Sequence, residues 1–300
     1  MKKTNLILQT NALKICKEIE AFIYVSMKNL KRDGAVLGLS GGLDSAVVAM
    51  LAVRSLGREK VHALYLPEKD SNPIHRKHAI QYADQLGIQL TVRSISPVLR
   101  ATKTYTILPL GAIPGRKLRS AVVDFGRRKL LEHNDERIFV DRLDPNGNSW
   151  LEKGNAYGMA KHRVRMALIY QYAELNNLMV MGAANRTELL TGTFCKWGVD
   201  HCSDIMPVLH IFRSQLEEMA DYLEIPAYIR NKPSDPDLYP TKIDKGDFLG
   251  GFKNADQILF NLENKVDKKD LYAVYDQKIV DHVFSLFKSS EHMRNSPLHL

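Results

Sequence analysis

The segment with the clearest chemical potential is Leu39-Ser40-Gly41-Gly42-Leu43-Asp44-Ser45. Its paired glycines let a backbone approach an anion closely, and its two serines add hydroxyl donors. A carboxylate alone would repel phosphate, so Asp44 makes sense beside a cation such as Mg²⁺ that bridges to the phosphates. The segment lacks the Gly-Lys-Ser/Thr ending of a Walker loop. We therefore predict a phosphate-binding loop of another type.

The pattern around this loop predicts how the fold presents it. Residues 35–39 form an apolar run typical of a buried strand, and residues 45–56 have the composition of a helix. A loop between strand and helix lies at the positive end of the helix dipole. Alternation continues with expected strands at 61–66, 89–92 and 178–182 and expected helices at 12–29, 72–86, 161–175 and 214–223. This order predicts an α/β fold, a doubly wound parallel sheet with helices on both faces.

The chain is expected to form a single domain over residues 1–300, with one interruption. Prolines, glycines and dense charge break the pattern at about 101–154, which predicts an inserted or mobile region. Residues 231–251 are expected to form a long loop, and a helical tail follows up to Pro297.

Composition excludes some classes of protein. The formal net charge is +8, yet no aromatic-basic motif accompanies it, so nucleic-acid binding is not expected. No run is long and apolar enough to predict a membrane span. Three cysteines in 300 residues do not make a disulfide framework, and no signal-like core follows Met1, so a cytoplasmic location is expected.

Further motifs narrow the choice of family. After the phosphate loop the chain carries Arg-Val-Arg-Met, Gly-Ala-Ala-Asn-Arg-Thr-Glu-Leu, Phe-Cys-Lys-Trp-Gly, Ser-Asp-Ile-Met-Pro, Lys-Pro-Ser and Ser-Glu-His-Met-Arg, at 163–166, 182–189, 194–198, 203–207, 232–234 and 290–294. In order and spacing this set resembles the ammonia-dependent NAD synthetases, within the N-type ATP pyrophosphatases of the adenine nucleotide α-hydrolase superfamily. The resemblance covers most of the chain and is weakest at about 100–155.

The resemblance implies a ligase that uses ATP and Mg²⁺ to amidate nicotinic acid adenine dinucleotide with ammonia, releasing AMP and pyrophosphate through an acyl-adenylate. It implies catalytic roles for Asp44, Lys196 and Arg213, and Mg²⁺ ligation by Asp44 and Glu188. The implied ATP-binding residues are Gly38, Leu39, Ser40, Gly41, Gly42, Leu43, Asp44, Ser45, Arg213 and Ser234. The implied residues for the dinucleotide substrate are Arg163, Lys196, Asp200, Asp204 and His292.

Several positions depart from the family pattern. Ala183 stands where the family has threonine, and Val199 stands where it has an aspartate, which here follows one residue later. Arg213 replaces a lysine that contacts ATP, Phe248 replaces an acidic residue, and Met293 replaces a lysine. These departures leave two alternatives open: a related ATP pyrophosphatase that amidates or thiolates another acceptor, such as nicotinate mononucleotide or an RNA base, and a nucleotide-binding paralogue with little turnover.

The resemblance also bears on partners. It implies a homodimer, because the active sites of the family lie near a subunit interface. The predicted helix before the phosphate loop begins near Ala12, so no glutaminase domain is expected before it. Free ammonia is therefore the expected nitrogen donor, unless a separate amidase subunit supplies it.

Overall fold

A computed structural model gives the fold, and it describes residues 5–108, 113, 115–130, 143, 149–199, 201–234, 246 and 249–296. A four-stranded parallel sheet lies at its centre, in the order β3-β2-β1-β4. The strands are β1 (Gly34–Gly38), β2 (Val61–Tyr65), β3 (Gln89–Val92) and β4 (Leu178–Met181). All four predicted strands are confirmed to within one residue at each end.

The register of the strands aligns their apolar runs with one another. Ala35 pairs with Val61 on one side of β1 and with Met179 on the other, so the middle of the sheet is apolar throughout. Every residue of β4 is buried, as is typical of a strand covered on both faces. Gly34 is required where β1 begins, because a Cβ there would lie 2.4 Å from the carbonyl oxygen of Lys60.

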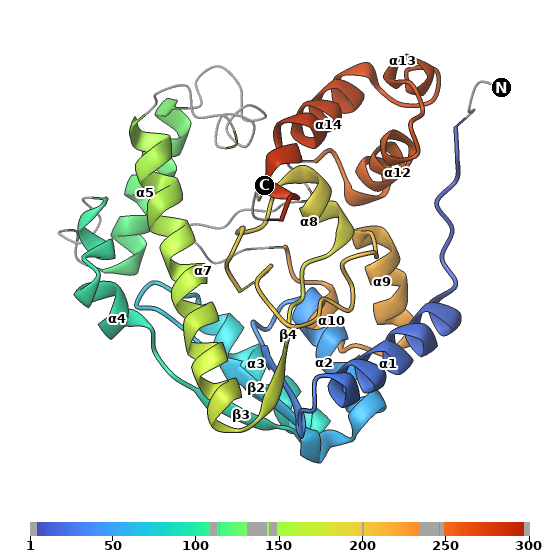
Figure 1. The fold of residues 1–300 in the computed structure, drawn as a ribbon. Coiled ribbons are helices and arrows are strands. Elements are labelled where there is room, and N and C mark those ends of the chain that lie inside the picture. Colours follow the sequence, from blue (N-terminus) through green and yellow to red (C-terminus); the bar gives the residue numbers. More distant parts are fainter. Residues whose placement is uncertain are drawn as a thin grey trace.

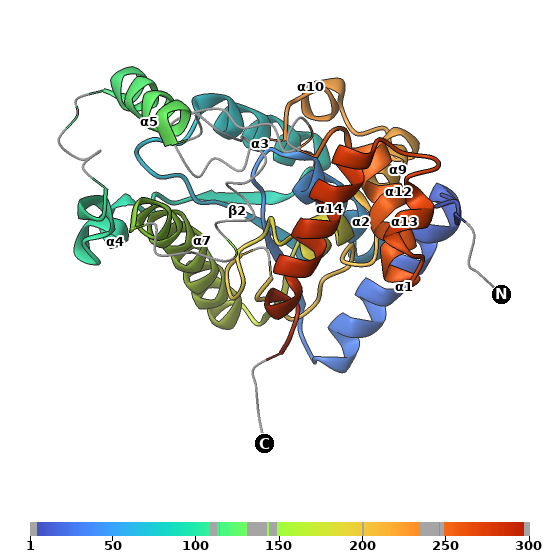
Figure 2. The same ribbon diagram turned by 90° about the horizontal axis from the view of Figure 1, so that it is seen from above.

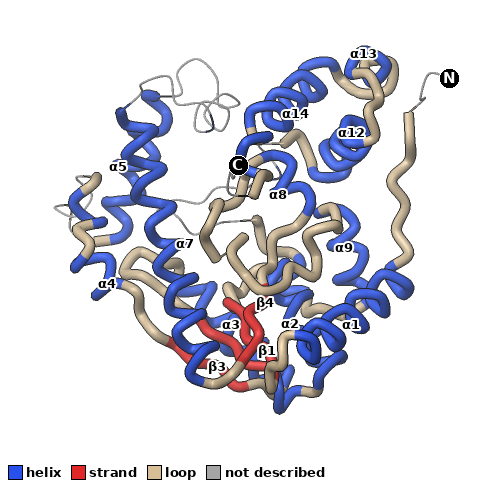
Figure 3. The backbone as a smooth tube through the Cα atoms, in the orientation of Figure 1, coloured by secondary structure: helices blue, strands red, loops and turns tan. Residues whose placement is uncertain are grey.

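Helices cover both faces of the sheet, which confirms the doubly wound α/β fold. One face packs against α1 (Ala12–Asn29), α2 (Leu43–Leu56), α3 (Pro73–Leu86) and α9 (Arg213–Tyr222). The other face packs against α4 (Ser96–Ala101) and α7 (Ser149–Leu175). Figure 2 shows α3 and α7 on opposite sides of β2, and Figure 3 shows the strands surrounded by helices.

A second core lies above the carboxyl ends of the strands. Its helices are α8 (Arg186–Thr191), α12 (Phe252–Glu263), α13 (Lys268–Leu271) and α14 (Gln277–Ser289), and the last three lie together in Figure 1. The extended N-terminal segment is tied to this core, since the amide of Leu6 donates to Oδ1 of Asn261 over 2.7 Å. The expected C-terminal helical tail is thus a packed element. Short helices complete the described chain: Arg58–Lys60, Thr104–Thr106, α10 (Ala227–Arg230) and η4 (Glu291–Met293).

The stretch at 101–154 holds more helix than its sequence pattern indicated. It contains α5 (Arg116–Leu130), and α7 begins at Ser149 rather than at the expected Lys161. In the sequence, Gly154 and Gly158 indicate breaks in a helix, because each glycine costs a helix about 1 kcal/mol relative to alanine. Burial of Tyr157, which is 1% exposed, outweighs that cost. Most of the expected loop at 231–251 lies outside the described residues.

Candidate active site

A cavity in the described part of the chain lies where the strand order reverses, at the carboxyl ends of β1 and β4. In doubly wound sheets this position is the usual ligand site. The cavity has a volume of about 190 Å³. Its lining includes ten of the predicted site residues, namely Gly38, Leu39, Ser40, Gly42, Leu43, Asp44, Ser45, Glu188, Arg213 and Ser234.

The phosphate loop is held by its own side chains. The Oγ atoms of Ser40 and Ser45 lie 3.0 Å apart, the amide of Ser40 donates to Ser45 Oγ, and the amide of Gly42 donates to Ser40 Oγ. Gly41 has φ +72°, and a Cβ there would come within 2.6 Å of the carbonyl oxygen of His75. Gly42 caps α2 without a side-chain hydrogen bond, which leaves the helix N-terminus suited to an anion.

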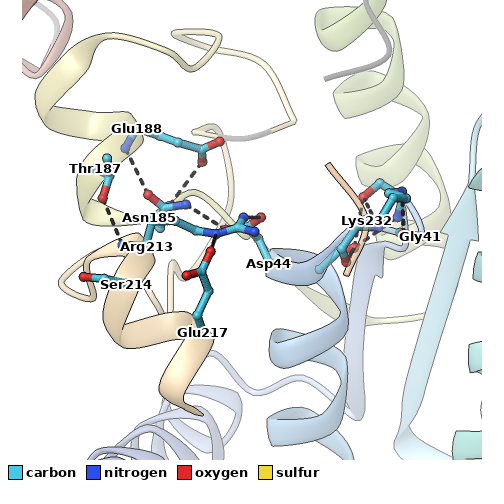
Figure 4. A network of polar contacts seen from close by, with 12 residues as sticks. Gly41, Asp44, Asn185, Thr187, Glu188, Arg213, Ser214, Glu217 and Lys232 are labelled. Carbon is cyan, nitrogen blue, oxygen red and sulfur yellow. Dashed lines mark hydrogen bonds and ion pairs between the residues drawn. The ribbon is translucent and has the colours of Figure 1, made fainter. Parts of the chain in front are cut away.

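Asp44 lies in the first turn of α2 and is bound from two sides. Asn185 Nδ2 donates to its Oδ1 over 2.7 Å, and Arg213 Nη1 donates to its Oδ2 over 2.8 Å, as Figure 4 shows. Arg213 also donates to Glu217 Oε1 over 3.1 Å. Burial by itself would lower the pKa of the Arg213 guanidinium, but Asp44, Glu217 and Glu188 outweigh it and raise that pKa. A permanently charged arginine therefore faces the phosphate loop.

The second carboxylate, Glu188, is held on α8 by a capping box. Its amide donates to the side chain of Asn185, and its own carboxylate accepts from the amide of Asn185. Asn185 thus links the two carboxylates predicted to hold Mg²⁺. Asp44 and Glu188 both line the cavity, and carboxylate oxygens are ligands of the kind that Mg²⁺ takes.

A buried aspartate fixes the two helices that carry these groups. Asp256, in α12 and fully buried, accepts from Thr187 Oγ1 over 2.6 Å and from the amide of Ser214 over 2.7 Å. Thr187 Oγ1 in turn accepts from the amide of Arg213. Burial raises the pKa of Asp256, against the effect of these hydrogen bonds. Sequence reasoning missed Asp256, because nothing local marks an aspartate that contacts residues about 40 to 70 positions away.

Lys232 is another residue that the sequence did not single out for the site. Its Nζ donates to the carbonyl oxygen of Gly41 over 2.7 Å and lies 2.8 Å from Nδ1 of His75. Lys232 and His75 both line the cavity. Figure 4 shows Lys232 beside Gly41. The Lys232-Pro233-Ser234 segment therefore places a cation next to the phosphate loop, together with the predicted Ser234.

Three of the predicted substrate residues form a separate cluster. Arg163 Nη2 lies 3.5 Å from the carbonyl oxygen of Lys196, and Lys196 Nζ donates to the carbonyl oxygen of His292 over 3.0 Å. These residues come from α7, from the loop after α8 and from η4, yet they meet at one place. None of them is among the residues that line the cavity.

The other two predicted substrate residues, Asp204 and Asp200, are not part of this cluster. Asp204 lies at the edge of β4, where it accepts from Tyr170 and from the amide of Val180, so the structure gives it a role in the fold and no place in the cavity. Asp200 lies outside the described residues.

Arg165 lines the cavity, whereas Arg163 of the same Arg-Val-Arg motif does not. Arg165 Nε donates to the carbonyl oxygen of Leu66. The helical spacing of Met159, His162, Arg165 and Ile169, all lining residues, could have indicated this.

Three departures from the family pattern line the cavity, and Arg213, described above, is one of them. Ala183 and Val199 both contribute apolar surface there. Met293 packs against the C-terminal core, and Phe248 lies outside the described residues. Arg213, Ala183 and Val199 are therefore the departures that bear directly on the described cavity.

Together, a phosphate loop at the switch point of a parallel sheet, a buried arginine and two carboxylates define a nucleotide-binding α/β enzyme. The model of the NAD synthase family matches residues 15–109 and 134–297. The chain therefore belongs to the NAD synthase family. Residues 110–133, which include α5, are left unmatched.

Similar proteins agree with this assignment. The chain is 38% identical over 277 residues to the NH₃-dependent NAD⁺ synthetase of Thermotoga maritima, covering 91% of this chain and 94% of the relative. It is 32% identical over 288 residues to the enzyme of the same description from Coprothermobacter proteolyticus, covering 95% and 97%.

Solved structures share the fold. The NMN synthetase of Francisella tularensis has a TM-score of 0.70 at 24% identity, over 97% of this chain and 99% of that one. The NH₃-dependent NAD synthetase of Campylobacter jejuni has a TM-score of 0.68 at 23% identity, over 97% and 100%. Among the described helices, none has the length and apolar character needed to cross a membrane.

Proposed function

We propose that the chain forms a C–N bond by amidating nicotinic acid adenine dinucleotide to NAD with ammonia, at the expense of ATP. The observation that carries this proposal is the charged arrangement at the cavity. Arg213, 5% exposed, faces Asp44 in the first turn of α2, beside a loop shaped for an anion. The choice of acceptor and of ammonia as nitrogen donor is supported by the family and by the relatives.

In the proposed reaction, the substrate carboxylate oxygen attacks the α-phosphorus of ATP and pyrophosphate leaves. Ammonia then attacks the acyl carbon of the adenylate, AMP leaves with the bonding electron pair, and the nitrogen loses a proton. Negative charge collects on phosphate oxygens in the first step, so fixed cations stabilise it. Loop amides and the start of α2 would hold the phosphates, and Arg213 and Lys232 would neutralise them.

Asp44 and Glu188 fit a magnesium ion as this proposal requires. When bound, Mg²⁺ would supply positive charge next to the phosphate oxygens that carry the developing charge. Arg213 now holds one oxygen of Asp44 and Asn185 holds the other, so both partners would reorient their hydrogen bonds on binding. The cluster of Arg163, Lys196 and His292 would contact the dinucleotide.

A direct assay tests this proposal. The purified chain is incubated with Mg-ATP, ammonium salt and either nicotinic acid adenine dinucleotide or nicotinate mononucleotide, and pyrophosphate and amide product are both measured. We expect turnover with the dinucleotide. Faster turnover with the mononucleotide would support the alternative acceptor, and nucleotide binding without pyrophosphate release would support a paralogue with little turnover.

The nitrogen source is tested in the same assay. We expect ammonium to support turnover and glutamine alone to fail. Ammonia attacks as the neutral species, so the rate at fixed total ammonium should rise with pH. Equal rates from glutamine and ammonium would contradict the proposal.

We further propose a homodimer in a reducing compartment such as the cytoplasm. The cysteines Cys16, Cys195 and Cys202 are all free thiols. Closed two-fold pairs are the commonest oligomers, and family resemblance supports one here. Light scattering at micromolar concentration tests the assembly, and a mass near that of one 34.0 kDa chain would contradict it.

A further inference from the structure

The turn after β2 forms a wall of the cavity that the phosphate loop does not supply. Pro67 and Ser71 both line the cavity, and the residues between them do not. The turn is closed on itself, because the amide of Ser71 donates to the carbonyl oxygen of Glu68 and the amide of Glu68 donates to Ser71 Oγ, both over 3.1 Å. The position of this wall therefore depends on what holds Glu68 and Asp70.

Both carboxylates of the turn are buried and paired behind the cavity. Glu68 accepts from Lys161 Nζ over 2.8 Å and from Tyr105 over 2.9 Å, and both side chains of the ion pair are at most 1% exposed. Burial by itself would raise the pKa of Glu68, but Lys161 and Tyr105 outweigh it and lower that pKa. Lys161 belongs to α7, which also supplies His162 and Arg165 to the cavity.

Asp70 is held by α5, which stands at the edge of the molecule in Figures 1 and 2. Nη2 and Nε of Arg119 lie 2.6 Å and 2.8 Å from Oδ1 of Asp70, whose side chain is 0% exposed. Arg116 Nε donates to the carbonyl oxygen of Asp70 over 2.9 Å, and Arg119 Nη1 donates to that of Ile113 over 2.7 Å. Among the described residues, Oδ2 of Asp70 has no hydrogen-bond partner, so compensation of this buried charge falls on Arg119.

The segment that carries both arginines, 110–133, is the one that the family model leaves unmatched. It nevertheless reaches a turn that lines the nucleotide cavity. We propose that Arg119 is a positioning residue for ATP: through Asp70 it holds the Pro67–Ser71 wall in its binding shape, so α5 sets the affinity for the nucleotide. This inference rests on the proposed function, because it takes ATP as the occupant of the cavity.

The test compares variants of the full chain in binding α,β-methylene-ATP and in steady-state turnover. Arg119→Ala leaves a buried carboxylate without its cation, which is strongly unfavourable, so the wall is expected to move. We expect the Kd for the analogue and the KM for ATP to rise by roughly tenfold or more, with kcat at saturating ATP close to that of the wild type. This split between KM and kcat separates positioning from general damage.

Three further variants sharpen the test. Arg119→Lys keeps the charge and loses the planar fork, so its Kd should lie between those of the wild type and Arg119→Ala. The double variant Asp70→Asn with Arg119→Gln leaves no orphaned charge and should bind more tightly than Arg119→Ala. Lys117→Ala, an exposed site on the same helix, removes an equal charge and should leave the Kd unchanged.

Each outcome decides something. A wild-type Kd in Arg119→Ala, or an equal loss in Arg119→Ala and Lys117→Ala, overturns the inference while the proposed function stands. If Arg119→Ala does not fold, Arg119→Lys and the double variant decide in its place, and a wild-type Kd in both overturns the inference. If the wild-type chain binds no ATP analogue, the proposed function itself fails, and the inference fails with it.

Discussion

The phosphate-loop end of the site differs in construction from the cluster of Arg163, Lys196 and His292, here called the acceptor cluster after its proposed role. At the first, Asp44 and Arg213 form an ion pair whose side chains are 21% and 6% exposed, within a continuous set of hydrogen bonds. At the second, Arg163 and His292 are exposed, and the links to Lys196 run through backbone carbonyl oxygens. The first region is preorganised, whereas the second has side-chain charges still available to a ligand.

This difference in burial predicts how large an effect the removal of a charge has in each region. Buried charge pairs interact in a low dielectric and lose much when one partner is removed. Exposed cations are screened by water and salt, so each contributes less. We therefore expect changes at the phosphate-loop end to have large effects and changes at the acceptor cluster to have smaller, substrate-specific ones.

The largest effect is expected from Asp44→Asn. The variant loses the charge that would hold a metal at the phosphates, and such stabilisation is worth several kcal/mol, so pyrophosphate release should fall by about a thousandfold or more. The fold should persist, since Arg213 keeps Glu217 as a partner. Asp84→Asn, an exposed site on α3, is the control. Mg²⁺-dependent release near the wild-type rate in Asp44→Asn would contradict the predicted role.

The buried charges next to the nucleotide cavity should make stability depend on pH. Because the pKa of Glu68 is lowered on folding, its pairing stabilises the protein above its ordinary value of 4.5 and is lost as pH falls through the lower folded value. Glu68→Gln removes the carboxylate that compensates the buried charge of Lys161 and should cost about 3–5 kcal/mol at neutral pH. Urea unfolding should show this cost shrink below pH 4.5, where Glu68 of the unfolded chain becomes protonated before Glu68 of the folded protein.

An exposed pair provides the matched control for this measurement. Glu174 pairs with Arg32 across 3.2 Å, and its side chain is 62% exposed. Glu174→Gln should therefore cost less than about 1 kcal/mol. Equal costs for the two variants would show that burial does not govern the strength of these pairs.

A smaller effect is expected from Lys196→Ala in the acceptor cluster. The KM for the dinucleotide should rise about fivefold, since a partly exposed cation contributes about 1 kcal/mol to binding an anion. The KM for ATP should not change, because Lys196 does not line the cavity. Lys253→Ala, exposed on α12, is the control. A matching rise in the KM for ATP would remove the distinction between the two regions.

The smallest effect is expected from Ala183→Thr, which restores the residue that the family pattern has at this place. A hydroxyl added to the cavity wall can contribute about 0.5–1.5 kcal/mol through one hydrogen bond, so the KM for ATP should fall a few-fold. Ala183→Val adds similar volume without the hydroxyl. If both variants lower the KM equally, packing and not hydrogen bonding accounts for the change.

Sequence patterns predicted the local structure around the phosphate loop, because a strand end and a helix start are set by neighbouring residues. Residues 38–45 supply a strand end, a turn and a helix start in one continuous segment, so backbone rules suffice. The Asn185-Arg186-Thr187-Glu188 capping box is local in the same sense, although only Glu188 was singled out. The four strands follow from apolar runs for a similar reason, since strand period and burial are visible within a few residues.

Contacts between distant segments were decided only by the tertiary structure. Asp256 reaches Thr187 and Ser214, Lys232 reaches Gly41, and Arg119 reaches Asp70. Helix α5 was missed as well, since glycine, proline and dense charge obscured its pattern. An ionisable residue in a sequence does not reveal whether it will be solvated or buried. A buried ionisable residue needs a partner of opposite charge. Which residue becomes that partner depends on the packing of elements that lie far apart along the chain.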